Sequence, residues 1–358
     1  MDLERLRKKI DEIDDQILGL LNARAEVVKE VGKSKAKSSM AYYDPSREER
    51  ILNRLQKINK GPFPVSSIRA VFREIISASL SLEKPIRIAY LGPEATFTHI
   101  AALKKFGLSA SLTPMISLTR VFSAVERDQA DYGVVPMENS TEGVAIHTLD
   151  LFIDSELKTC TEVIFNIRHD LLAQHSELDK IERVYAHPQS IAQCSEWLRE
   201  NLPNRHIIEV PSTFRAVEQV REDASAALIA EETIRELYRL HTVAKKIEDN
   251  TNNFARFLVL WKGTSAPTGN DQTSLLFSMK DQIGALSLLL QPFAHHQVSL
   301  RRIESRPIPN RPWESVFLVD FDGHIQEDRV ARLLEDLKVH CDFFKILGSY
   351  PKSKLSAE

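Results

Sequence analysis

The sequence contains few cysteines, and their positions indicate no framework. Its 358 residues include Cys160, Cys194 and Cys341, which lie far apart and lack any Cys-x-x-Cys spacing. This pattern predicts neither disulfide bonds nor a zinc site, and we interpret the three as ordinary buried thiols. The histidines are scattered, and no glycine-rich dinucleotide fingerprint is present. We therefore expect no metal and no organic cofactor.

Long apolar runs and an excess of charge of one sign are also missing. No run approaches the roughly 18 apolar residues of a membrane span. The opening segment, MDLERLRKKIDEIDD, is too charged for a secretory leader. The 47 basic and 50 acidic residues nearly cancel, so no broad cationic face is expected. The sequence thus predicts a cytoplasmic protein with no membrane partner and no nucleic-acid partner.

The first 84 residues have the pattern of helices. Between residues 3 and 31, apolar side chains recur at alternating spacings of three and four, which predicts a long helix with a heptad-like stripe. A second helix should follow the capping residue Asp44, and a third should run from about residue 66 to 82. Three helices with so few turns cannot close a large core alone, so we expect this part to dimerise by intertwining its long helices.

From Ile86 on, the pattern of apolar residues changes to short runs separated by helix-length stretches, which predicts an α/β domain. The segment GTSAPTGND, residues 263–271, has the composition of a linker. After it, the expected order of strand, helix, strand, strand, helix, strand is that of a small α+β ferredoxin-like domain. We therefore predict an all-α domain at 1–84, an α/β domain at 85–263 and a ferredoxin-like domain at 272–358.

A cationic residue continues the apolar stripe of the first helix. Arg24 occupies the next place after Leu20, and burying an unpaired guanidinium is costly, so an anionic group should meet it. An acidic residue on a partner helix, or snorkelling of the side chain to the surface, would also satisfy this need. Further charged residues accompany Arg24 in the helical part, namely Arg7, Lys35, Asp44, Arg47 and Glu48.

The segments LRKKIDEIDDQILGLLNARAEVVKEVGKSKA and DPSREERIL resemble the all-helical chorismate mutase family, over residues 3–83. The resemblance implies that Arg7, Arg47 and, from the other subunit, Arg24 grip the two carboxylates of chorismate. It implies that Lys35 donates to the ether oxygen, and that Asp44 and Glu48 hold the hydroxyl. These residue types suit the Claisen rearrangement to prephenate, which needs a compact substrate conformer and stabilisation of charge on the ether oxygen rather than a nucleophile.

One position departs from the mutase family. Many bacterial members have Gln as a second donor to the ether oxygen where this chain has Glu83, with Ser79 one turn before it. A carboxylate cannot donate, so Glu83 could serve only in its protonated form. We predict that mutase activity falls as rising pH removes this proton, and that Glu83→Gln flattens the pH profile. An unchanged profile in the variant would count against this role.

Four segments of the α/β part carry polar residues, namely GPEATFT, VVPMENSTEG, VYAHPQSIAQC and NNFARFLVL. Each alone is also typical of a turn or a helix cap. Together and in this order they resemble prephenate dehydratase, over about residues 86–262. The resemblance implies two lobes around a cleft, as in periplasmic binding proteins, with Arg256 on the pyruvyl carboxylate of prephenate. The site residues that it implies are Thr96, Thr98, Asn139, Ser140, Thr141, Gln193, Arg256 and Phe257.

The dehydratase pattern also has departures. Ala255 stands where the family has a threonine regarded as catalytic, and Ala186 stands where many relatives have serine. Losing a hydrogen bond to the transition state costs about a hundredfold or more in rate. Thr251, Ser140 or a water could supply the group; alternatively the domain only decarboxylates prephenate, or it is a ligand sensor beside an active mutase. The identity of the proton donor and the choice between prephenate and arogenate stay open.

Two segments of the last domain resemble the effector-binding motifs of ACT domains in phenylalanine-regulated dehydratases. They are the helix start at Gly284 and the strand end Arg302-Ile303-Glu304-Ser305-Arg306-Pro307; a purely structural domain is the alternative. The resemblance implies L-phenylalanine as effector and a second contact in a homodimer or higher oligomer. The effector residues that it implies are Gly284, Ala285, Leu286, Glu304, Ser305, Arg306 and Pro307. The whole chain is thus expected to convert chorismate through prephenate to phenylpyruvate under feedback inhibition.

Overall fold

The structure is a computed structural model that describes residues 3–38, 43–140, 143–279, 283–307 and 315–353. The all-α part consists of α1 (Leu3–Ser38), α2 (Pro45–Ile58) and α3 (Val65–Glu83). Helix α1 continues beyond the predicted end at residue 31. Asp44 caps α2 as predicted, because its carboxylate accepts hydrogen bonds from the backbone N–H groups of Ser46 and Arg47.

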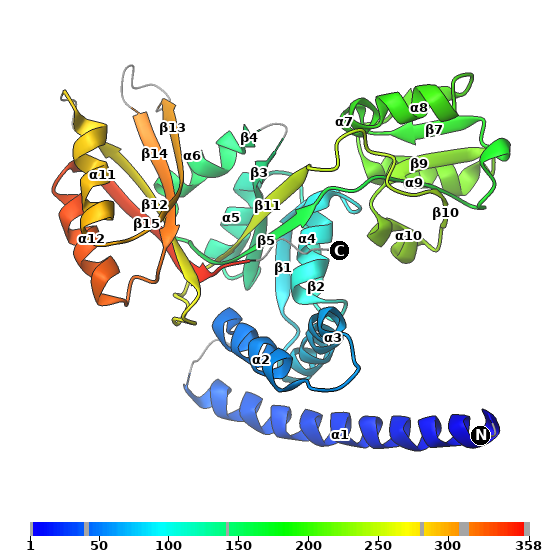
Figure 1. Cartoon of the computed structure of the whole chain (residues 1–358), viewed down its shortest axis with the longest axis horizontal. Coiled ribbons are helices and arrows are strands. Elements are labelled where there is room, and N and C mark those ends of the chain that lie inside the picture. The colour runs from blue at the N-terminus through cyan, green and yellow to red at the C-terminus, as the bar shows by residue number, and fades with distance from the viewer. Residues whose placement is uncertain (1–2, 39–42, 141–142, 280–282, 308–314, 354–358) are drawn as a thin grey trace.

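The apolar stripe of α1 is uncovered along much of its length. The side chains of Ile10, Ile17, Leu20 and Val27 are 57, 50, 71 and 59% exposed. Figure 1 shows α1 running along the lower edge of the molecule, with α2 and α3 above the half that leads to α2. A row of large apolar side chains in water is typical of a surface that another chain covers.

The α/β part has two lobes, as expected. The first lobe carries one sheet in the order β2-β1-β3-β11-β5, with β4 paired to β3. Helix α4 packs on one face of this sheet and helices α5 and α6 on the other. Its elements are β1 (Arg87–Leu91), α4 (Phe97–Phe106), β2 (Ser111–Met115), α5 (Leu118–Glu126), β3 (Tyr132–Asn139), β4 (Gly143–Val144), α6 (Ile146–Asp154), β5 (Lys158–Asn166) and β11 (Phe254–Trp261).

The second lobe carries a sheet in the order β10-β6-β9-β7-β8. Two segments cross between the lobes, and they bond to each other where Ile167 N–H donates to Asn253 O and Ile247 N–H donates to His169 O. The elements are β6 (Asp170–Ala173), the 3-10 turn Leu178–Lys180, β7 (Arg183–Ala186), α7 (Pro188–Gln193), α8 (Ser195–Asn201), β8 (His206–Glu209), α9 (Thr213–Glu222), β9 (Ala226–Ala230), α10 (Glu232–Tyr238) and β10 (His241–Ala244).

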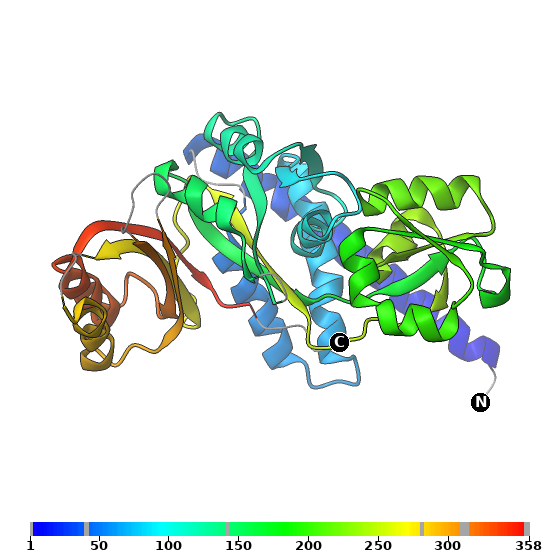
Figure 2. The ribbon, with the colours of Figure 1, turned by 90° about the horizontal axis from the view of Figure 1, so that it is seen from above.

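The terminal domain has the predicted ferredoxin-like order. Its sheet runs β13-β14-β12-β15, with helices α11 and α12 on one face. The other face packs against the first lobe through Leu276, Leu318 and Leu347. The elements are β12 (Asp271–Met279), α11 (Ala285–His295), β13 (Leu300–Pro307), β14 (Ser315–Asp322), α12 (Asp328–Lys338) and β15 (Cys341–Pro351). Figure 2 shows the terminal domain and the second lobe at opposite ends, with the first lobe between them. The expected three-part fold class is thus confirmed.

In the part of the chain that is described, no helix combines the length and the apolar character needed to cross a membrane. The cytoplasmic location stays a prediction from the sequence.

Candidate active sites and effector region

Helices α1 and α3 bring four of the predicted mutase residues together. The half-buried Arg24 donates from Nη1 to the hydroxyl of Ser79, and partial burial lowers the pKa of this guanidinium. Farther along the same helices, Nζ of Lys35 lies 3.5 Å from a carboxylate oxygen of Glu83. Gly32 allows this approach, because a Cβ built there would lie 3.0 Å from Cγ of Glu83. We take the region between the second half of α1 and the end of α3 as the candidate mutase cleft.

The assignment of Arg24 to the other subunit is wrong for this structure, because Arg24 contacts Ser79 of its own chain. Arg7 is the residue that its own chain cannot bring to this cleft. It lies on the same unbroken helix, 17 residues before Arg24, which corresponds to about 26 Å along the helix axis. The side chain of Arg7 is exposed.

The α2 residues of the predicted mutase site have other partners here. Glu48 is buried, pairs with Lys105 of α4 at 3.0 Å and accepts a hydrogen bond from the hydroxyl of Tyr43. A buried carboxylate needs such a cation, so Glu48 is held by the first lobe. This corrects the sequence-based prediction that Glu48 holds the hydroxyl of the substrate. One carboxylate oxygen of Asp44 accepts the hydrogen bonds that cap α2, and the side chain of Arg47 is exposed.

The predicted dehydratase residues of the first lobe lie at the start of α4 and where β3 ends beside the start of β11. Thr96 caps α4 by accepting a hydrogen bond from His99 N–H, and Thr98 is buried in the first turn. Asn139 ends β3, directly opposite Ala255 in the antiparallel register. The hydroxyl of Ser140 accepts from Phe254 N–H at 3.0 Å and bonds to the side chain of Asn253 at 2.7 Å. Thr141 lies outside the described residues.

A histidine that the sequence reasoning missed sits at the junction of the lobes. His169 is 1% exposed, and its Nε2 lies 2.8 Å from Oε1 of the predicted site residue Gln193. Its ring meets the ring of Phe97 edge-on, with centroids 6.1 Å apart, and Phe97 stands between Thr96 and Thr98. His169 therefore links Gln193 of the second lobe to the first turn of α4. A histidine between two apolar runs, in FNIRHDLLA, was the available signal.

Burial lowers the pKa of His169, and burial also lowers the pKa of His99, whose ring stacks on Tyr90. Both therefore take up a proton at a lower pH in the folded protein than in the unfolded chain, where a histidine titrates near pH 6.5. The free energy of unfolding should fall as pH drops below about 6.5, by up to about 1.4 kcal/mol per pH unit for each histidine. Urea unfolding between pH 8 and 5 measures this slope. His169→Asn should reduce it and His206→Asn, at an exposed position, should not; equal slopes in all three proteins would contradict the assignment.

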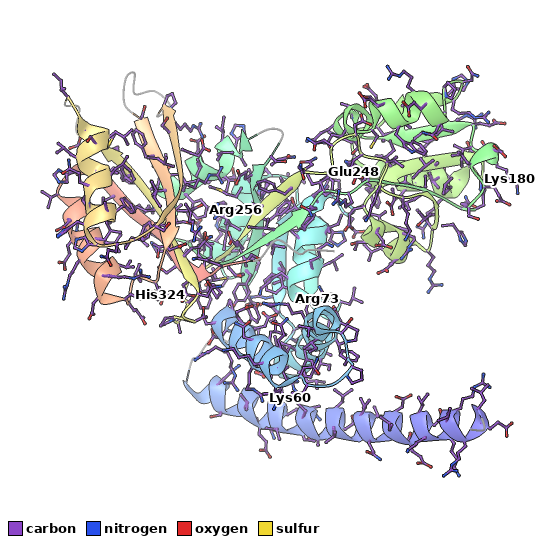
Figure 3. All side chains as sticks on the ribbon, in the orientation of Figure 1. Lys60, Arg73, Lys180, Glu248, Arg256 and His324 are labelled. Atoms are coloured by element: carbon purple, nitrogen blue, oxygen red, sulfur yellow. The ribbon has the colours of Figure 1, made fainter. Side chains whose placement is uncertain are left out.

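Arg256 does not face the cleft, which corrects the sequence-based prediction. Ala255 and Arg256 both lie within β11, which begins at Phe254, and successive side chains of a strand point to opposite faces. Ala255 and Phe257 therefore pack on the α4 side, where Phe257 stacks on Phe165. Arg256 points to the terminal domain, at the junction where Figure 3 labels it.

There Arg256 is 5% exposed, and its guanidinium has three partners. It donates to Glu162 at 2.8 Å, to Asp320 at 2.5 Å and to the hydroxyl of Tyr350 at 3.0 Å. Burial raises the pKa of Glu162. Burial acts to lower the pKa of Arg256, but Tyr350, Asp320 and Glu162 together hold it well above its usual range. Glu162 belongs to the first lobe and Asp320 and Tyr350 to the terminal domain. Arg256 is thus a buried cation between two domains and has no access to prephenate.

The predicted effector residues lie at one end of the terminal sheet. Gly284 has a positive φ of 79° and precedes α11, and the register of β12, β14 and β13 places the ends of β12 and β13 together. Glu304, Ser305 and Pro307 are exposed there, as is Leu286, while Ala285 is partly buried. Arg306 differs, because it donates to Ile146 O at 2.5 Å and to Asp150 at 2.9 Å in α6 of the first lobe. In this chain it is an interdomain contact and not an open effector ligand.

One group of side chains among the described residues has the donors of a metal site. His295, His296 and Asp336 lie where α11 ends beside α12, with their ligand atoms within 4.8 Å of one another. Nε2 of His296 already contacts Asp336 at 2.7 Å. No sequence pattern predicted this group, because 40 residues separate His296 from Asp336. Of the cysteines, Cys160 and Cys194 are buried as predicted, whereas Cys341 is only partly buried.

Comparisons with known proteins match three family models along the chain. The model described as chorismate mutase type II matches residues 6–84, prephenate dehydratase matches 88–265 and the ACT domain matches 273–339. A bifunctional chorismate mutase/prephenate dehydratase of Aquifex aeolicus is 46% identical over 358 residues, which cover 99% of each chain. The protein of the same description from Pseudomonas aeruginosa is 40% identical and covers 99% of this chain and 98% of its own.

Solved structures agree with the fold of the last two domains. The structure of prephenate dehydratase from Arthrobacter aurescens in complex with L-Phe is 32% identical to this chain, with a TM-score of 0.66. The match covers 74% of this chain and 90% of the Arthrobacter chain.

Proposed function

The chain belongs to the family of bifunctional chorismate mutase/prephenate dehydratases, and we propose that it carries out the two reactions in sequence, chorismate to prephenate and prephenate to phenylpyruvate. The observation that carries this conclusion is the order of the three matched regions over nearly the whole chain. The product of the first domain is the substrate of the second, and the third is a ligand-binding type of domain. The reading in which the middle domain only senses a ligand is not favoured.

The mutase reaction is proposed to occur in the cleft between α1 and α3. Arg24 would hold a carboxylate of chorismate, and Lys35 would donate to the ether oxygen as negative charge develops there. Ser79 and Glu83 orient these two cations in the free protein. Arg7 is proposed to reach the cleft of a partner chain, because it is about 26 Å from its own. The exposed apolar stripe of α1 supports the homodimer that this requires.

The dehydratase reaction is proposed to occur in the cleft between the lobes, near Asn139, Ser140 and Gln193. The bond from the ring to its carboxylate breaks, the electron pair enters the ring, and the ring hydroxyl leaves as water once it has gained a proton. Of the candidate groups for assisting that hydroxyl, Ser140 has the best support. Its Oγ accepts from the backbone N–H of Phe254, the residue next to Ala255, where the family has a hydroxyl. Its proton, donated to Asn253 Oδ1 in the free protein, would turn to the leaving hydroxyl. Thr251 is an exposed turn residue.

Ser140→Ala should therefore lower kcat for phenylpyruvate formation by about a hundredfold, with mutase activity unchanged. Adding Ala255→Thr to this variant should restore much of the loss, because the two hydroxyls would occupy neighbouring positions. Thr251→Val is the matched control and should behave like wild type. If Thr251→Val loses activity and Ser140→Ala does not, the assignment to Ser140 is wrong. Initial rates with prephenate, followed by the absorbance of phenylpyruvate, provide the measurement.

L-phenylalanine is proposed as the effector of the terminal domain. The ACT family match and the L-Phe complex of the Arthrobacter protein support this choice. Backbone groups at Gly284 would meet the charged ends of the amino acid, and the exposed end of β13 would form the other side of the site. Since β13 is an edge strand of its sheet, a second terminal domain can lie beside it.

A further inference from the structure

The strands that line the dehydratase cleft also have a rear face. β3 and β11 are antiparallel neighbours in which Asn139 pairs with Ala255 and Glu138 pairs with Arg256. Because side chains alternate along a strand, Glu138 and Arg256 leave the sheet on the side opposite to Asn139 and Ala255. Each strand thus places one residue at the cleft and the adjacent residue against the terminal domain.

On the rear face, Glu138 forms an ion pair with Arg302 of β13. The pair is largely shielded, since the side chain of Arg302 is 13% exposed and that of Glu138 is 21% exposed. Shielding from water makes a guanidinium–carboxylate contact far stronger than a surface pair. Arg302 is therefore a firm attachment of β13 to the residue that precedes Asn139.

A second arginine of β13 holds the same part of the first lobe four residues later. Arg306 donates to Ile146 O, at the start of α6, and to Asp150, about one turn farther along this helix. β4, which pairs with β3 through Glu138 and Val144, lies between these two points. Two arginines of β13 thus bind the first lobe: Arg302 binds the end of β3, and Arg306 binds α6. A shift of β13 along or away from the lobe must displace Asn139 and Ser140 or break these contacts.

We propose that Arg302 and Arg306 are positioning residues for the dehydratase reaction: they hold β3 and α6 from behind and so fix Asn139 and Ser140 in the cleft. This inference rests on the proposed dehydratase activity and its effector. The two arginines belong to the strand whose exposed end faces the effector region. An amino acid bound between that end and Gly284 therefore acts on the cleft through the grip of β13 on Glu138 and Asp150.

The test compares Arg302→Met with Arg301→Met in the full-length protein. Arg301 is the neighbouring residue, but it is 58% exposed and pairs with Asp322 of its own domain. Arg302→Met should lower kcat/KM for prephenate by about tenfold or more, whereas Arg301→Met and the mutase activity of both variants should match wild type. L-phenylalanine should still bind Arg302→Met, as measured by calorimetry, but should change its dehydratase rate at least about fivefold less than in wild type.

Glu138→Gln provides a second route to the same contact, with nearly unchanged side-chain volume. It should reproduce the loss of Arg302→Met, and the double variant should lose no more than either single variant. Additive losses, or an Arg302→Met that behaves like Arg301→Met, would overturn the proposal. Failure of the proposed function is distinguishable, because the wild-type protein would then form no phenylpyruvate before any substitution is made.

Discussion

Replacing Arg256 by methionine is expected to lower the free energy of unfolding by about 3–5 kcal/mol. The substitution leaves Glu162 and Asp320 buried and without their shared cation, while Tyr350 loses a hydrogen-bond partner. Uncompensated buried charge is among the most destabilising changes a protein can undergo. Because the three partners join the first lobe to the terminal domain, the two should also separate more readily. Urea unfolding followed by circular dichroism gives the stability, and limited proteolysis reports the separation.

Arg183→Met is the matched control for Arg256→Met. Arg183 forms a similar close pair with Asp223 at 2.6 Å, but 40% of its side chain is exposed. Solvent screens such a pair, so the control should unfold at the same urea concentration as wild type. The interpretation from sequence makes the opposite prediction for Arg256, namely a raised KM for prephenate at unchanged stability. That result would support a role for Arg256 in binding prephenate in the cleft.

Two inactive mutase variants are expected to restore activity to each other. Arg7→Ala and Lys35→Ala should each lose about a hundredfold or more in mutase rate, because each removes a cation from the transition state. When the two chains are co-expressed with different tags and the mixed dimer is isolated, one of its two clefts has both cations. The mixed dimer should therefore show about half the wild-type mutase activity.

The control pairs Arg24→Ala with Lys35→Ala. Arg24 and Lys35 lie in one cleft of one chain, so each cleft of this mixed dimer lacks a cation and activity should stay low. Recovery with Arg24→Ala but not with Arg7→Ala would mean that Arg24 is the residue supplied by the partner, as the sequence first suggested.

The sequence predicted elements and motifs well where a local pattern decides them. The helical stripe of α1, the cap at Asp44 and the order of the terminal domain follow from periodicity, capping chemistry and turn residues. Arg256 shows the limit of this reasoning. The apolar run FLVLW, from which the strand is predicted, begins at Phe257 and leaves the side of Arg256 undetermined. Only the pairing of β11 with β3 and β5 settles it.

Contacts between segments that are far apart in the sequence are the other part that sequence reasoning could not supply. The pairing of Glu48 with Lys105, of Glu138 with Arg302 and of His169 with Gln193 joins residues 24 to 164 positions apart. No local pattern encodes such distances. Family resemblance identified Glu48 and Gln193 by their positions in a motif, and the structure adds the partners that orient them.

Incubation of the purified protein with chorismate tests the central claim most directly. The amounts of chorismate, prephenate and phenylpyruvate are followed over time, with and without added L-phenylalanine. Chorismate should be consumed, prephenate should appear as the intermediate, and phenylpyruvate should form more slowly when L-phenylalanine is present. Accumulation of prephenate without any phenylpyruvate would contradict the proposed dehydratase activity, because the cleft around Ser140 would then not convert prephenate.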